Sequence, residues 1–123
     1  MINIRIVNEG ESDKLRELNK KIFVNNPRYD DDLTPDFANT SKGIEYFKNC
    51  ITRKDGCCFL AEENGELIGY VNGGHLDIPY RKSRYFEIEN LGVVPSSKRK
   101  GVGALLLEEV IQWAKKNGTK KSI

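Results

Sequence analysis

Cysteine and histidine, the residues that build most metal and redox sites, are scarce in this sequence. Its 123 residues include three cysteines and one histidine. Cys57 and Cys58 are neighbours, so they lack the C-x-x-C spacing of zinc and redox motifs. They begin an apolar run, which indicates small buried hydrophobic residues with free thiols. We therefore predict no metal site, and we interpret His75 as a polar residue near a strand end.

Long apolar runs and a strong charge of either sign are also missing. No segment approaches the ~18 apolar residues of a membrane span, and the alternating N-terminus lacks the apolar core of a signal peptide. Lysine and arginine number 20 against 18 acidic residues, a net charge of +2. The basic clusters at 98–100 and 115–116 have no interleaved aromatic residues. These absences predict a cytoplasmic protein with neither a membrane nor a nucleic-acid partner.

The length predicts one domain, residues 1–123, and the apolar spacing predicts alternating strands and helices. The expected elements are a strand at 2–6, a helix capped by Ser12, a helix capped by Thr40 or Ser41, strands at 57–61, 67–71 and 85–94, a helix at 101–116 and a strand that begins after Gly118. Between the two central strands, Asn64-Gly65 indicates a type I′ turn. The acidic triplet Asp30–Asp32 is typical of a solvated loop, with attraction of a cationic substrate as the alternative.

The most informative segment is a strand that ends at Pro95, a short basic turn and the start of an amphipathic helix. Gly101 and Gly103 have no Cβ to keep a ligand from the main chain, and a helix start leaves N–H groups unpaired at the positive end of its dipole. Together these features predict a phosphate-binding turn. The three glycines of a dinucleotide fingerprint and the Gly-Lys-Ser/Thr of a Walker loop are both absent, which excludes those motifs.

This segment resembles the acyl-CoA site of the GNAT superfamily of N-acetyltransferases. The matching pattern is a basic residue, two residues, glycine, one residue and glycine, after a strand that ends Leu-x-Val-x-Pro. The family has Arg or Gln where this chain has Lys98. The order of predicted elements is also similar to the GNAT order. The resemblance implies an α/β GNAT acyl-CoA N-acyltransferase fold, with a mixed, mostly antiparallel sheet and helices on both faces, that stops after the start of the fifth strand.

The resemblance also implies acetyl-CoA as co-substrate and an amine as acceptor. In the family, main-chain groups of the turn bind the pyrophosphate, nearby basic side chains add positive charge, and the main chain of the preceding strand binds the pantetheine arm. The implied acetyl-CoA residues are Leu91, Val93, Lys98, Arg99, Lys100, Gly101, Val102, Gly103 and Ala104. The alternative is a solvated basic turn that follows ordinary core strand residues.

Two carboxylates are candidates for the general base. Glu89 stands six positions before Pro95, where similar GNAT members, including aminoglycoside acetyltransferases, have an acidic residue. The resemblance implies that Glu89 takes the proton of the acceptor amine, with Glu87 in reserve. In a regular strand both would share a face with Leu91. The alternative is a pair of solvent-facing or substrate-binding charges, and no residue matches the family's leaving-group tyrosine.

The predicted function is therefore transfer of an acetyl group from acetyl-CoA to a primary amine of a small molecule or protein. The alternative is a catalytically incompetent domain that binds CoA or a partner chain, because the family's fourth helix and last hairpin have no counterpart in this sequence. The same difference predicts an uncovered sheet edge, through which two copies would form a homodimer.

Overall fold

A mixed five-stranded sheet forms the centre of the molecule. The computed structural model describes residues 1–23, 39–76, 85–117 and 121–122. The strands are β1 (Ile2–Ile6), β2 (Gly56–Glu63), β3 (Glu66–Leu76), β4 (Tyr85–Val93) and β5 (Lys121–Ser122), and they lie in that order across the sheet. The first four strands pair antiparallel, and β5 pairs parallel to β4. The predicted mixed, mostly antiparallel sheet is confirmed.

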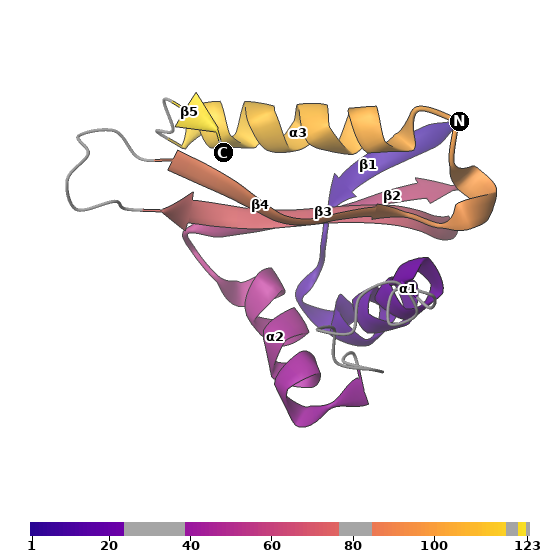
Figure 1. The fold of residues 1–123 in the computed structure, drawn as a ribbon, viewed down its shortest axis with the longest axis horizontal. Coiled ribbons are helices and arrows are strands. Elements are labelled where there is room, and N and C mark those ends of the chain that lie inside the picture. The colour runs from indigo at the N-terminus through magenta and orange to yellow at the C-terminus, as the bar shows by residue number, and fades with distance from the viewer. Residues whose placement is uncertain (24–38, 77–84, 118–120, 123) are drawn as a thin grey trace.

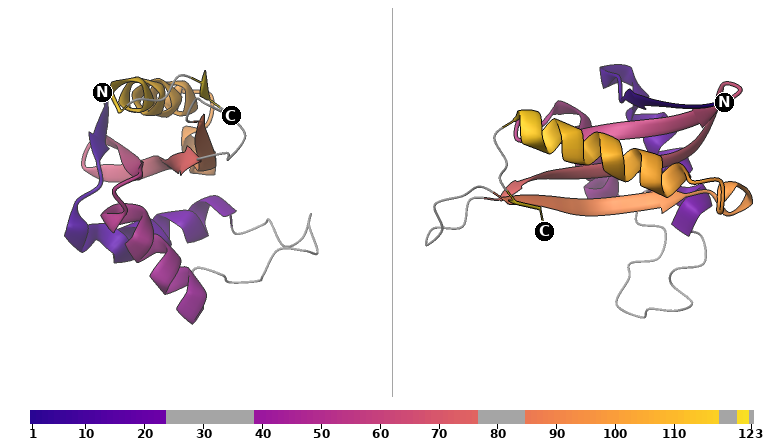
Figure 2. Two further views of the ribbon diagram at one scale, coloured as in Figure 1. Left: turned by 90° about the vertical axis from the view of Figure 1, so that its left-hand side faces the viewer. Right: turned by 90° about the horizontal axis from the view of Figure 1, so that it is seen from above.

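Helices cover both faces of this sheet, as predicted. Helix α3 (Val102–Lys116) lies on one face, and α1 (Ser12–Phe23) and α2 (Ser41–Thr52) lie on the other (Figure 1). The left view of Figure 2 shows these three layers, with the strands between α3 and the other two helices. The buried residues of α3 recur every four positions, so one face of the helix packs on the strands: Val102, Leu106, Val110 and Ala114. None of the helices in the described ranges has the length and apolar character needed to cross a membrane.

Two predicted local signals are confirmed. Asn64 and Gly65 both have positive φ, 53° and 80°, which is the geometry of a type I′ turn and joins β2 to β3. The side chain of Thr40 caps α2, because its Oγ1 accepts a hydrogen bond from the Gly43 N–H at 3.0 Å.

The start of α1 differs from its prediction. A 3-10 turn, Glu9–Glu11, precedes Ser12, and the carboxylate of Glu11 accepts a hydrogen bond from the N–H of Asn8 at 2.8 Å. Arg5 donates to both oxygens of Glu11, at 2.7 and 2.8 Å, and these bonds lower the pKa of Glu11 to about 2. The prediction that Ser12 caps this helix is wrong, because the turn built on Glu11 already begins it.

The cysteines and the histidine lie in the interior. Cys57 and Cys58 are buried free thiols, as predicted, and so is Cys50; burial raises the pKa of Cys50 to about 11 and that of Cys57 to about 12. His75 is buried near the end of β3, where its ring contacts aromatic rings of β4 and α3. The triplet Asp30–Asp32 lies outside the described residues.

A β-bulge interrupts the long strand β4. Asn90 pairs with Asn72 of β3, but Ile88 pairs with the next residue, Gly73, so Glu89 is an extra residue with no partner of its own. An extra residue shifts the alternation of side chains beyond it by one position. This irregularity determines where the predicted catalytic carboxylates lie.

Candidate active site

A cleft of about 500 Å³ opens where the end of α1, the end of β4 and the start of α3 meet. Its lining residues are Ile22, Phe23, Leu91–Val93, Ser97–Arg99 and Gly101–Gly103. Among the predicted acetyl-CoA residues, all but Lys100 and Ala104 line this cleft. The structure therefore brings together residues of the strand, the turn and the helix around one open volume.

The turn between β4 and α3 exposes main-chain donors to this cleft. Arg99 and Gly101 have φ of 75° and 79°, the left-handed region. Gly101 is the N-cap of α3 and has no side chain to cap the first N–H groups, and no other cap bond is formed within the described residues. These donors point out of the helix start, where the helix dipole also favours an anion.

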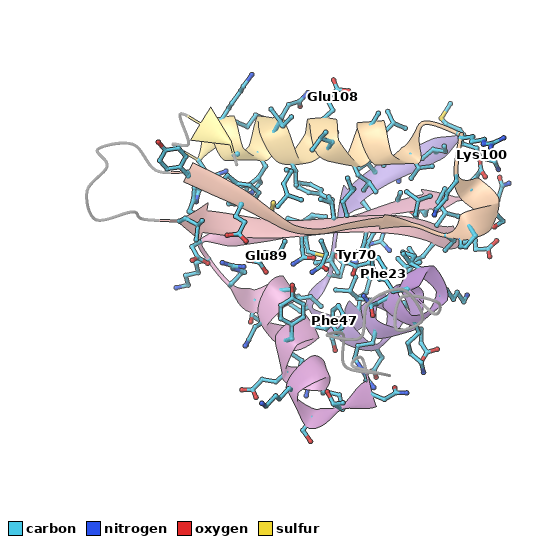
Figure 3. All side chains as sticks on the ribbon, viewed as in Figure 1. Phe23, Phe47, Tyr70, Glu89, Lys100 and Glu108 are labelled. Carbon is cyan, nitrogen blue, oxygen red and sulfur yellow. The ribbon has the colours of Figure 1, made fainter. Side chains whose placement is uncertain are left out.

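The geometry around the glycines fits a phosphate group. A Cβ added at Gly101 or Gly103 would meet no atom within 4 Å, so both residues border open space. Lys98 and Arg99 are exposed and line the cleft. Lys100, labelled at the turn in Figure 3, instead forms an ion pair with Glu63 of the β2–β3 hairpin, with Nζ and Oε1 3.1 Å apart. Ala104 is exposed in the first turn of α3, away from the cleft lining.

The outer edge of β4 beside the cleft is open to an extended ligand. β5 pairs with Tyr85 and Phe86 only, so within the described residues no strand covers the edge from 87 to 93. Main-chain groups along this edge can bind a ligand as an added strand would. Gly92 allows the end of α1 to approach, because a Cβ there would lie 2.7 Å from Ile22 Cγ2. One wall of the cleft thus rests directly on the strand.

The bulge separates the two carboxylates from Leu91. Glu87 pairs with Gly74, where an added Cβ would overlap the guanidinium of Arg53 at the end of α2, so Glu87 lies on the α2 face. Glu89 also lies on that face, as its contacts with α2 show. Leu91 lies on the α3 face, so the prediction that it shares a face with the two carboxylates is wrong. The extra residue at position 89 reverses the alternation.

Glu89 is held by two side chains from the α2 region. Oε2 accepts from Arg53 Nη1 at 2.7 Å, and Oε1 accepts from the Tyr46 hydroxyl at 3.1 Å. The side chain is 28% exposed, and Figure 3 shows it between β4 and α2. It lies two residues before the cleft residue Leu91 along the strand. A partly exposed carboxylate at this place can accept a proton from a group bound beside the cleft.

Two amides complete the surroundings of Tyr46. Its hydroxyl oxygen accepts from Asn90 Nδ2 at 2.6 Å and from Asn72 Nδ2 at 3.1 Å. Burial raises the pKa of Tyr46 above its ordinary range, so at neutral pH the phenol is protonated and acts as a donor to Glu89. No motif or spacing in the sequence marks the residues around Glu89, which are Tyr46, Arg53, Asn72 and Asn90.

Comparison with known proteins identifies the family. The model of the acetyltransferase (GNAT) family matches residues 14–123. The uncharacterized N-acetyltransferase YhfO of Bacillus subtilis (strain 168) is 32% identical over 84 residues, which cover 68% of this chain. The chain spans about half of that relative's length, 56%.

Solved structures show the same fold. An aminoglycoside acetyltransferase, HMB0005, from an uncultured soil metagenomic sample matches all of this chain and 78% of its own, with a TM-score of 0.78 and 15% identity. The acetyltransferase AAC(6')-Iy, in complex with the bisubstrate analogue CoA-S-monomethyl-acetylneamine, also covers 100% of this chain and 78% of its own, with a TM-score of 0.75 and 21% identity. The family match over most of the sequence and the shared fold agree with the cleft: the chain belongs to the GNAT family of acetyltransferases.

Proposed function

We propose that this chain transfers an acetyl group from acetyl-CoA to a primary amine of a small molecule or a protein. One observation carries the proposal. A cleft with uncapped main-chain donors lies at one end of the open edge of β4, and Glu89 lies farther along the same strand. The first feature fits the pyrophosphate of CoA, and the second provides a proton acceptor two residues from the cleft residues of the strand.

Each part of the site has a role in this transfer. The first N–H groups of α3 bind the pyrophosphate, and the main chain at Leu91 and Val93 binds the pantetheine arm. A main-chain N–H of β4 polarises the thioester carbonyl. The amine nitrogen attacks the carbonyl carbon, the carbon–sulfur bond breaks, and its electron pair leaves with the sulfur of CoA. Glu89 accepts the proton that the amine loses, directly or through a water molecule.

The acceptor is an amine in its neutral form, because a protonated amine has no electron pair for the attack. A carboxylate beside the acetyl-CoA cleft supplies the base for that deprotonation. Glu87, half-buried on the same face of β4, is the second candidate for the base. The similarity to aminoglycoside acetyltransferases makes aminoglycosides the first small amines to test, beside peptides with a free N-terminus or lysine.

A titration of the chain with acetyl-CoA tests the cofactor half of the proposal. We expect saturable heat of binding in the wild type and none in Gly103→Trp, whose indole would fill the cleft. Gly10→Trp is the matched control, because a Cβ at Gly10 also meets no atom within 4 Å but lies in a distant 3-10 turn. Equal binding by Gly103→Trp and the wild type would contradict the assigned cleft.

Release of the CoA thiol with a panel of amines then tests the transfer. Thiol release that needs an amine, and that falls in Glu89→Gln, supports the proposed function. Saturable binding without thiol release from any amine would support the alternative, a domain that binds CoA without catalysis.

A further inference from the structure

Each oxygen of Glu89 has a close donor from one segment of the chain, and Asn72 Nδ2, 3.5 Å from Oε1, is a more distant third donor. Tyr46 lies on α2, and Arg53 is the C-cap residue of that helix, where its N–H bonds to the carbonyl of Asn49. The hydroxyl holds Oε1 and the guanidinium holds Oε2. A carboxylate fixed at both oxygens has one orientation rather than many.

Glycines on two adjacent strands leave space for the guanidinium of Arg53. A Cβ at Gly56 would lie 2.8 Å from Arg53 Nε, and a Cβ at its pairing partner Gly74 would overlap the guanidinium. Two adjacent strands thus have glycine, which has no side chain, at the positions that face the guanidinium. Arg53 Nε also donates to Asp55 Oδ1 at 2.9 Å. The arginine is therefore located by the sheet and by Asp55, independently of Glu89.

The hydroxyl of Tyr46 is directed in a comparable way. Its oxygen accepts from two amides, Asn90 Nδ2 and Asn72 Nδ2. Because both bonds use the lone pairs of the oxygen, the phenolic proton is left to bond to Glu89 Oε1. Donation runs from the amides to Tyr46 and from Tyr46 to the carboxylate.

In this orientation the amide of Asn72 leaves its own oxygen without a hydrogen bond from the described part of the chain. The residue is 1% exposed, and its Oδ1 has no hydrogen-bond partner among the described residues. An unsatisfied buried acceptor destabilises the folded chain. A leucine of similar shape would fill the position without that cost. The Nδ2 of Asn72 donates to Tyr46, to Cys50 Sγ at 3.3 Å and to Glu89 Oε1 at 3.5 Å, so this amide acts on Glu89 both directly and through Tyr46.

We propose that Tyr46 and Arg53 are positioning residues that hold the Glu89 carboxylate in the single orientation from which it takes the proton of the acceptor amine. This inference rests on the proposed function, in which Glu89 is the base. It adds that the efficiency of that base depends on α2 and its C-cap residue, neither of which lines the cleft for acetyl-CoA.

A spectroscopic measurement tests the contacts without any assay of transfer. The side-chain carboxyl carbons of glutamate are labelled with carbon-13, and the Glu89 resonance is identified by its loss in Glu89→Gln. At a fixed neutral pH we expect this resonance to move in Tyr46→Phe and in Arg53→Gln. Tyr70→Phe is the matched control, since Tyr70 is also a buried phenol that accepts from an asparagine, Asn19, at 2.8 Å. An unmoved resonance in Tyr46→Phe would overturn the inference.

A double-mutant kinetic cycle tests whether Tyr46 acts through Glu89. We expect Tyr46→Phe to lower kcat about tenfold and to leave the KM for acetyl-CoA unchanged, because it removes orientation and no cofactor contact. In a Glu89→Gln background the same change should cost nothing more. Arg53→Lys should restore part of the activity that Arg53→Gln loses.

The outcomes separate the two proposals. An equal loss from Tyr46→Phe with and without Glu89 would mean that Tyr46 acts on the acceptor or the fold, and it would overturn the positioning role. Full activity of Glu89→Gln would instead overturn the base in the proposed function, while the carbon-13 measurement still decides whether Tyr46 and Arg53 hold the carboxylate.

Discussion

The C-terminal end and the middle of β4 carry sites that are built in opposite ways. At the C-terminal end, a continuous stretch of chain offers main-chain donors, and its glycines matter because they have no side chain. Around Glu89, the contacts are made by side chains from α2, β3 and β4, and each chemical group matters. The first site should tolerate changes of side chain but no added Cβ that alters the main chain. The second should respond to the loss of a single polar atom.

The largest effect that sharpens this contrast is expected from Gly101→Val. A β-branched residue is strained at the φ of 79° that Gly101 adopts, by about 1–2 kcal/mol, so the turn would leave its present shape. We expect the affinity for acetyl-CoA to fall on the order of 100-fold, about 2.7 kcal/mol. Lys98→Ala, which removes an exposed charge and leaves the main chain intact, should cost less than about tenfold. Calorimetric titration of both variants gives the comparison. Equal losses would show that side chains, rather than main-chain donors, bind the phosphates.

The same contrast decides what the sequence could reveal. Apart from Ile22 and Phe23 of α1, the cleft residues lie in one segment, so local spacing predicted the strand, the turn with Gly101 and Gly103, and the helix that follows. The partners of Glu89 lie 43 and 36 residues away, at Tyr46 and Arg53, and no local pattern connects them. Only the fold brings them together.

Two other features that the sequence did not predict, the bulge in β4 and the start of α1, also depend on contacts between separate elements. The bulge at Glu89 is a property of the pairing of β4 with β3, since the register on both sides of it is fixed by residues of the other strand. The start of α1 depends on Arg5, which binds Glu11 from β1. The element order and the Asn64-Gly65 turn were predictable because each is determined by neighbouring residues.

A smaller effect is expected from Asn72→Leu, which separates stability from function at the Glu89 site. The leucine removes the unpaired Oδ1 and keeps a similar shape, so we expect the free energy of unfolding to stay within about 1 kcal/mol of the wild type or to rise. The rate of acetyl transfer should fall several-fold, because Tyr46 loses one of its two amide donors and Glu89 Oε1 loses its bond from Asn72 Nδ2. Urea unfolding and the thiol-release assay measure the two quantities. A loss of stability above about 2 kcal/mol with normal turnover would mean that Asn72 serves the fold.

The smallest expected effect compares the access of water to Tyr46, beside Glu89, with the access of water to Tyr70 in the core. Burial raises the pKa of both Tyr46 and Tyr70 above the ordinary tyrosine value of about 10. Above that pH the unfolded chain loses these protons while the folded chain keeps them. The free energy of unfolding therefore falls with rising pH, by up to about 1.4 kcal/mol per pH unit for each such tyrosine.

Replacing either phenol should remove its share of this slope. We expect Tyr46→Phe and Tyr70→Phe to lose stability less steeply than the wild type between about pH 10 and 11. The buried thiols of Cys57 and Cys58, whose pKa values are also raised, contribute to all three proteins, and Cys50, which bonds to Tyr46, is replaced by alanine in all of them so that the differences report the phenols. Urea unfolding at a series of pH values gives the slopes. A wild-type slope in Tyr46→Phe, with a reduced slope in Tyr70→Phe, would show that water reaches Tyr46. The hydroxyl would then have solvent as an alternative partner, and its hold on Glu89 would be weaker than the fixed donor network requires.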